Sequence, residues 1–162
     1  RKVFVKASKL QGPDDIFIRR LGHCSLFVIV FIGVRLGNND NKGLSTAIDV
    51  LKKFASPDVL SIGIGCDESL PVSVSLRSLG PESVYRVLSS SYLTIITSRL
   101  ETFSMVALES QFCRTPVVFR ASLAPSTFKN SAFLYPSPDD SDESLIRAVG
   151  ELLSKKRNGN DG

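Results

Sequence analysis

Residues 25–34 read SLFVIVFIGV, a continuous run of β-branched, aromatic and aliphatic side chains. A strand of this composition is typical of the centre of a parallel sheet, because helices cover both of its faces. The surrounding segment 21–34 contains no Asp, Glu, Lys or Arg, but it is shorter than the ~20 apolar residues that a membrane-spanning helix needs. We therefore expect a buried strand here.

Helical and strand patterns alternate after this run. One apolar stripe follows at the spacing of a helix that starts after Gly43: Leu44, Ala47, Ile48, Leu51 and Phe54. We expect further strands at 59–64, 92–97, 116–119 and 132–135, and further helices at 81–88, 104–112 and around Leu145 to Leu153. This series predicts an α/β, Rossmann-like, doubly wound and largely parallel sheet with helices on both faces.

The composition fits one globular domain. The 162 residues carry a net charge of +4, with 43% hydrophobic and 22% charged residues, so a core can form without disulfides or metals. Basic residues do not interleave with aromatic ones, which argues against nucleic acid as a partner. The three cysteines, Cys24, Cys66 and Cys113, are far apart and form no Cys-x-x-Cys motif. They predict free thiols in a reducing, cytoplasmic compartment.

Missing motifs exclude several enzyme classes. No Gly-x-x-x-x-Gly-Lys-Ser/Thr occurs, and Gly63-Ile64-Gly65 has no third glycine, so neither a P-loop nor a dinucleotide fingerprint is present. His23 is the only histidine and precedes the first expected strand. A catalytic site built on histidine is therefore not expected.

Ligands of doubly wound sheets bind beyond the carboxyl ends of the strands. After the first strand come Gly33, Arg35 and the pair Lys42-Gly43. Arg35 offers a planar fork and Lys42 a point charge ahead of a helix N-terminus, which together suit a diphosphate. The alternative is two solvated cations in a turn.

The segment after the third expected strand, residues 101–109, reads ETFSMVALE. Glu101 would lie in the loop, the main-chain amides of residues 103–106 would be the unpaired donors of a helix start, and Glu109 would stand on its second turn. A carboxylate and a row of N–H groups would then surround one space. The alternative makes Glu101 a favourable charge at a helix start and Glu109 an exposed helix residue.

The spacing of Glu101 and Glu109 resembles the signature of the retaining glycosyltransferases of GT-B architecture, the group 1 set classed as glycosyltransferase family 4. There, a Glu-Gly-Phe-Gly phrase and an apolar helix precede Gly-Thr-Pro-Val-Val; here residues 113–118 read CRTPVV. Arg35 and Lys42-Gly43 stand where the family has its Arg and Lys-Gly. The resemblance extends from about Leu26 to Leu153.

This resemblance implies a carboxyl-terminal, donor-binding domain at 25–154, an interdomain linker at 1–24 and a flexible tail at 155–162. It implies that Arg35 and Lys42 grip the diphosphate of a nucleoside-diphosphate sugar and that Glu109 holds the ribose. The catalytic groups would be Glu101, Arg35 and Lys42, and the other donor contacts would be Gly33, Phe103, Ser104 and Met105. The four charged side chains are expected to converge on one pocket, with no metal.

The resemblance also implies that the sugar goes to a glycan or a lipid-linked acceptor in polysaccharide or related biosynthesis. Because the resemblance covers only the donor-binding domain and implies a missing amino-terminal acceptor domain, we expect the chain by itself to bind the donor weakly and to transfer little or nothing. The basic, apolar flanks leave peripheral contact with an anionic membrane surface open, at the cytosolic side.

Three departures from the family pattern keep other functions open. Thr102 and Ser104 replace two glycines, and Arg114 stands where a helix-ending glycine is usual. These residues favour a non-catalytic interaction domain as an alternative. Half of a sugar-nucleotide epimerase is a second alternative, because such epimerases share the architecture. The nucleotide base, the sugar, the acceptor and the oligomeric state are not predicted.

Overall fold

The computed structural model describes residues 17–18, 20–23, 25–36, 38–101, 104–123 and 132–157. Within these ranges six strands form one parallel sheet in the order β3-β2-β1-β4-β5-β6. The strands are β1 (Phe27–Ile32), β2 (Val59–Ile64), β3 (Val74–Leu76), β4 (Leu93–Ile95), β5 (Val117–Phe119) and β6 (Leu134–Pro136). The predicted Rossmann-like fold is confirmed.

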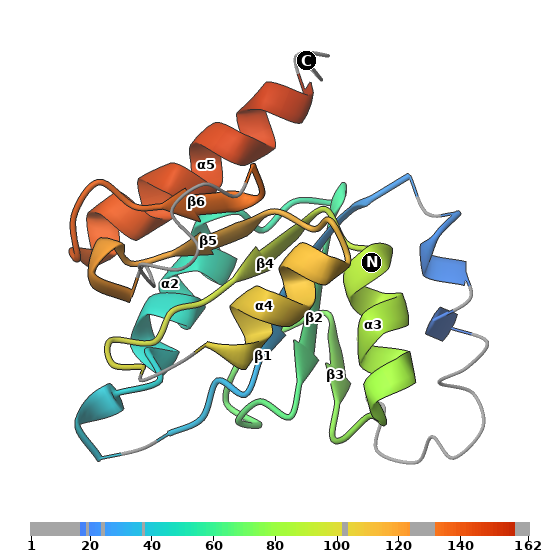
Figure 1. Ribbon diagram of the computed structural model, residues 1–162, viewed down its shortest axis with the longest axis horizontal. Coiled ribbons are helices and arrows are strands. Elements are labelled where there is room, and N and C mark those ends of the chain that lie inside the picture. Colours follow the sequence, from blue (N-terminus) through green and yellow to red (C-terminus); the bar gives the residue numbers. More distant parts are fainter. Residues whose placement is uncertain are drawn as a thin grey trace.

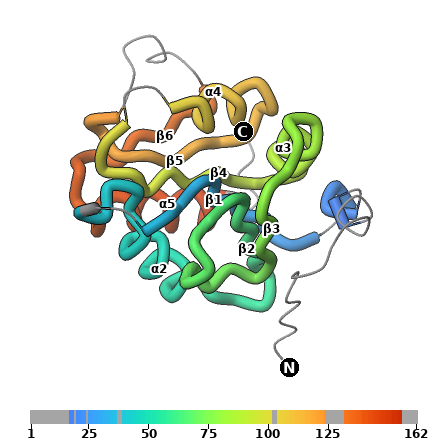
Figure 2. The backbone as a smooth tube through the Cα atoms, turned by 90° about the horizontal axis from the view of Figure 1, so that it is seen from below, coloured from blue at the N-terminus to red at the C-terminus, as the bar shows by residue number. Residues whose placement is uncertain are grey.

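The longer helices are divided between the two faces of the sheet (Figures 1 and 2). On one face α2 (Leu44–Lys53) packs beside α5 (Asp142–Arg157), and on the other α3 (Pro81–Ser89) packs beside α4 (Met105–Phe112). Two short 3-10 turns, η1 (Asn38–Asp40) and η2 (Ala121–Leu123), lie in the loops. This layering explains why β1 is apolar throughout.

The side chains of β1 alternate between two cores. Val28 and Val30 pack in a cluster with Val87 and Leu88 of α3. Ile29 and Phe31 pack in a second cluster, whose helical members come from α2 and α5. Because both clusters are buried, every position of this strand favours an apolar residue, and the period-two alternation of a half-exposed strand is absent.

Strand β3 is an addition to the predicted set. It has three residues and pairs with β2 through Ile62, Gly63 and Ile64. Its flank reads PVSVSL over residues 71–76, in which apolar side chains alternate with serine. This period-two pattern is a strand signal, but the other strands are predicted from predominantly apolar runs, and serine interrupts this one twice.

Both ends of the described chain hold more structure than expected. Ile18 and Leu21 belong to helical turns and are buried in the α3-side core, so this part of the segment expected to be an interdomain linker packs against the domain. At the other end α5 continues to Arg157, three residues into the expected tail. Across the described residues, none of the helices combines the length and the apolar character needed to cross a membrane.

The strand order places a topological switch between β1 and β4. The chain proceeds from β1 to β2 on one side, and then returns to β4 on the other side of β1. The loops after β1 and β4 therefore lead to opposite faces and leave space between the two strand ends. This is the junction at which a ligand is expected.

Candidate functional site

A cavity of about 210 Å³ lies at the switch between β1 and β4. Its wall comes from the ends of these strands, the start of α4 and two charged side chains: Ile32, Gly33, Val34, Lys42, Ile95, Ile96, Thr97, Ser98, Glu101, Ser104, Met105 and Val106. A larger, open hollow of about 760 Å³ runs along α5 and the end of α2, but none of its lining residues follows a strand. We therefore take the smaller cavity as the candidate site.

The part of the cavity wall that comes from β1 ends in Gly33, a position where the backbone requires glycine. Gly33 follows β1 with a φ of 67°, in the left-handed region where side chains other than glycine are strained. Its N–H donates to the carbonyl oxygen of Ile64 at 2.9 Å, which ties the turn to the end of β2. Gly33 therefore lines the candidate cavity, which is where the sequence places it.

The start of α4 faces the cavity with main-chain N–H groups. Ser104 is the N-cap, and its hydroxyl accepts the N–H of Ala107 at 3.3 Å. Met105 and Val106 line the cavity, and their N–H groups donate to none of the residues that the structure describes. A helix start with unpaired donors carries partial positive charge and attracts anions.

Lys42 and Glu101 meet at the mouth of the cavity. The ammonium nitrogen of Lys42 lies 2.8 Å from Oε1 of Glu101, and the two side chains are 46% and 20% exposed. An ion pair this exposed contributes at most about 1 kcal/mol, so a ligand anion can replace Glu101 as the partner of Lys42 at small cost. The pair therefore keeps Lys42 at the mouth without making it inaccessible.

The loops that carry these two residues are in close contact. Gly43 has a φ of 66°, and a Cβ there would lie 2.0 Å from the carbonyl oxygen of Thr97. The hydroxyl of Thr97 donates to the carbonyl oxygen of Lys42 at 3.0 Å. Because glycine at 43 permits this approach, the loop after β4 lies directly against the start of α2.

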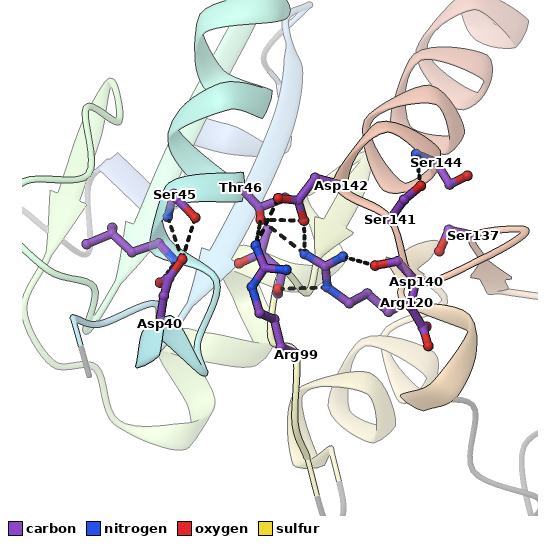
Figure 3. A network of polar contacts seen from close by, with 12 residues as sticks. Asp40, Ser45, Thr46, Arg99, Arg120, Ser137, Asp140, Ser141, Asp142 and Ser144 are labelled. Carbon is purple, nitrogen blue, oxygen red and sulfur yellow. Dashed lines mark hydrogen bonds and ion pairs between the residues drawn. The ribbon is translucent and has the colours of Figure 1, made fainter. Parts of the chain in front are cut away.

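Asp40 caps the start of α2, which the sequence offered together with Lys42 as a place for a diphosphate. Its carboxylate accepts the N–H of Leu44 at 2.6 Å, the N–H of Ser45 at 3.2 Å and the Ser45 hydroxyl, so it caps α2 (Figure 3). Burial opposes its ionisation, but the hydrogen bonds from Ser45 and Leu44 and the charge of Arg99 outweigh burial and lower its pKa. The start of α2 is therefore occupied, and the helix start that lines the cavity together with Lys42 is that of α4.

The other predicted site residues are spread more widely. Arg35 donates from Nε to the carbonyl oxygen of Gly65 at 2.8 Å and does not line the cavity. Glu109 is half-buried on α4 and does not line it either. Phe103, like Thr102, lies outside the described residues. Of the four charged side chains expected to converge on one pocket, only Lys42 and Glu101 do so.

The turn after α4 forms without its expected glycine. Arg114 adopts a φ of 57°, the left-handed conformation that glycine takes most easily. Its N–H donates to the carbonyl oxygen of Gln111 at 2.9 Å, and the N–H of Thr115 donates to that of Ser110 at 2.9 Å. These two bonds are a Schellman motif, so the departure at Arg114 leaves the path from α4 to β5 intact.

Sequence reasoning missed a polar group beside the site, formed by Thr46, Arg99, Arg120 and Asp142. Arg120 directly follows the apolar strand residues of β5, and a charged residue in that position was the available signal. Among the described residues no three His, Cys, Asp or Glu side chains gather as metal ligands.

The family described as glycosyl transferases group 1 matches residues 27–155, most of the chain. The chain belongs to the group 1 glycosyltransferases. A comparison of its sequence with curated proteins found no match.

Solved structures share its fold at low sequence identity. A UDP-forming α,α-trehalose-phosphate synthase from Burkholderia xenovorans has a TM-score of 0.63 and 12% identity over 86% of this chain and 39% of its own. An E. coli trehalose-6-phosphate protein bound with UDP-2-fluoro glucose has a TM-score of 0.62 and 12% identity over 91% and 40%. The catalytic domain of the cholesterol-α-glucosyltransferase of Helicobacter pylori has a TM-score of 0.57 and 18% identity over 82% and 89%. This group 1 chain thus has the fold of one GT-B glycosyltransferase domain and spans about 40% of the trehalose-phosphate structures' length.

Proposed function

We propose that this chain is the donor-binding domain of a retaining glycosyltransferase and that the cavity takes the diphosphate of a nucleoside-diphosphate sugar. The observation that carries the proposal is the meeting of a cation, a carboxylate and the start of α4 at the sheet's switch point. Each of these groups has a counterpart in the donor: Lys42 and the α4 amides suit the phosphates, and Glu101 suits a sugar hydroxyl.

The chemistry of sugar transfer fits this arrangement. Cleaving the bond between the sugar and the diphosphate leaves negative charge on the leaving phosphate oxygen. Fixed donors aimed at that oxygen stabilise the charge as it develops, and Lys42 with the N–H groups of Met105 and Val106 can supply them. Because Asp40 occupies the α2 start, the phosphates are directed to α4.

Arg35 and Glu109 lie outside the cavity lining. In this proposal they contact the parts of the donor that extend beyond it, with Arg35 on the diphosphate's outer side and Glu109 on the ribose. The remaining donor contacts are assigned to Gly33, Ser104 and Met105, which line the cavity, and to Phe103. No metal is required, because the cation and the helix start supply the positive charge.

The comparisons support the class of donor. One similar structure is bound with UDP-2-fluoro glucose, and another is named as a glucosyltransferase. The acceptor would be a glycan or a lipid-linked molecule bound by a second domain. By itself the chain is then expected to bind donor weakly and to transfer little, because in this proposal the acceptor contacts that align the reaction come from the second domain.

Titration of the chain with UDP, GDP and ADP by calorimetry tests the proposal. We expect at least one of them to bind, and Lys42→Ala to weaken that binding by about 1.5–3 kcal/mol, the contribution typical of hydrogen bonds to a charged group. Lys52→Ala is the matched control, because Lys52 is an exposed lysine in the last turn of α2, the helix that follows Lys42.

Two results would contradict the proposal. The first is no binding of any of the three nucleotides at millimolar concentration. The second is equal binding by wild type and Lys42→Ala. Either result would favour an interaction domain that keeps the fold without using the cavity.

A further inference from the structure

A buried arginine marks a polar network next to the cavity. Arg120 follows β5 and is 1% exposed. It is the largest fully buried side chain among the described residues. A buried guanidinium is costly unless its donors are satisfied. The partners of Arg120 therefore indicate which parts of the fold are joined through it.

Arg120 joins three loops at the carboxyl edge of the sheet. Its Nε donates to the carbonyl oxygen of Thr97 at 3.4 Å, and its Nη1 donates to that of Asp140 at 2.5 Å. Its Nη2 donates to the hydroxyl of Thr46 at 3.0 Å and to Oδ1 of Asp142. The ends of β4 and β5, the start of α2 and the start of α5 thus share one guanidinium (Figure 3).

A second arginine reaches the same carboxylate from the surface. Nη2 of Arg99 lies 2.8 Å from Oδ2 of Asp142 and 3.3 Å from the hydroxyl of Thr46, and Figure 3 shows both arginines pointing toward Asp142. Burial opposes the ionisation of Asp142, but hydrogen bonds from Arg120, Arg99 and Thr46 prevail and lower its pKa. Both carboxylate oxygens are therefore engaged.

Arg99 also belongs to the loop that carries Glu101. Its main-chain N–H donates to the carbonyl oxygen of Asn41 at 2.8 Å, one residue before Lys42. The side chain of Arg99 thus anchors its loop to α5, while its backbone holds the loop of Lys42. Glu101 is two residues further along and forms its ion pair with that lysine.

We propose that Arg99 is a positioning residue, which holds the Lys42–Glu101 pair at the cavity mouth by fixing its loop to Asp142 on α5. This inference rests on the proposed function, because it concerns the geometry of the donor site. Arg99 is 40% exposed at its side chain, and an ion pair at that exposure adds little to global stability. Its removal is therefore expected to loosen the two loops and to leave the fold intact.

The experiment compares the whole chain carrying Arg99→Gln or Arg99→Lys with wild type. Arg86→Gln is the matched control, because Arg86 is 45% exposed and pairs with Glu82 at 2.7 Å on the distant helix α3. Amide hydrogen exchange of residues 41–43 and 98–101 reports on the loops, the amides of β1 report on the fold, and calorimetry with UDP, GDP and ADP reports on the site.

We expect Arg99→Gln to speed exchange in the two loops by about tenfold, to leave β1 unchanged and to raise the nucleotide Kd by roughly 3- to 30-fold. Arg99→Lys is expected to return both the loop exchange and the nucleotide Kd most of the way to their wild-type values, because a single terminal nitrogen makes both side-chain contacts of Arg99. Arg86→Gln should change neither quantity.

The outcomes separate this inference from the proposed function. Unchanged loop exchange in Arg99→Gln would overturn the positioning role, whether or not nucleotide binds. Faster exchange with an unchanged Kd would overturn its link to the donor site. If wild type bound none of the nucleotides, the proposed function would fail, and with it the purpose assigned to Arg99.

Discussion

Arg120→Met is expected to lower the free energy of unfolding by about 3–5 kcal/mol, the usual cost of removing one partner of a buried ion pair. Methionine keeps much of the side-chain length, so most of the loss comes from the polar partners left behind. These are the carboxylate of Asp142, the hydroxyl of Thr46 and the carbonyl oxygens of Thr97 and Asp140, which all lose a donor in a region where Arg120 is 1% exposed. Chemical unfolding measures the change.

An exposed arginine gives the control for this substitution. Arg86→Met breaks the ion pair with Glu82 on α3, whose side chains are 45% and 81% exposed, and should cost less than about 0.5 kcal/mol. A cost below about 1 kcal/mol for Arg120→Met would contradict the view that Arg120 joins the loops at the carboxyl edge of the sheet.

Gly43→Ala is expected to destabilise the chain and to abolish nucleotide binding. A left-handed φ costs a residue with a Cβ about 1–2 kcal/mol. In addition, the new Cβ would lie 2.0 Å from the oxygen and 2.6 Å from the carbon of the Thr97 carbonyl, so the loop after β4 must move. That movement separates Lys42 from Glu101, whose pairing depends on the contact of the two loops.

Gly33→Ala separates the cost of the left-handed backbone from the cost of the clash with Thr97. Gly33 has nearly the same φ, 67°, but a Cβ there would meet nothing within 4 Å. We expect Gly33→Ala to lower the free energy of unfolding by the backbone cost alone, about 1–2 kcal/mol, and Gly43→Ala by at least about 1 kcal/mol more. Equal losses in the two variants would mean that the loop contact is not required.

Much of the fold could be predicted because burial leaves a trace in the residue pattern. Strand β1 is apolar without interruption because both of its faces are covered, and α2 has one apolar stripe because only one of its faces is. Strand β3 escaped prediction although β4, β5 and β6 are equally short, because serine alternates with its apolar residues and no continuous apolar run forms. Continuous apolar runs are thus easier to recognise as strands than short alternating ones.

The site could be predicted only in part, because its geometry depends on contacts between distant loops. Lys42 and Glu101 are 59 residues apart, and they became candidates because each stands in a motif of the family that the sequence resembles. The cap by Asp40 depends on a loop with positive φ at Asn39 and Asp40, which the residue types alone do not specify. The contact of Arg120 with Thr46 spans 74 residues and has no local pattern.

The central claim is that the cavity between β1, β4 and the α4 start binds a nucleoside diphosphate, and the amides of Met105 and Val106 test it most directly. In an NMR titration with UDP, GDP and ADP, we predict that at least one nucleotide shifts these two amides and that of Gly33, and that the shifts saturate. We also predict that amides in α3 stay in place. Saturating shifts that avoid Met105, Val106 and Gly33 would contradict the account.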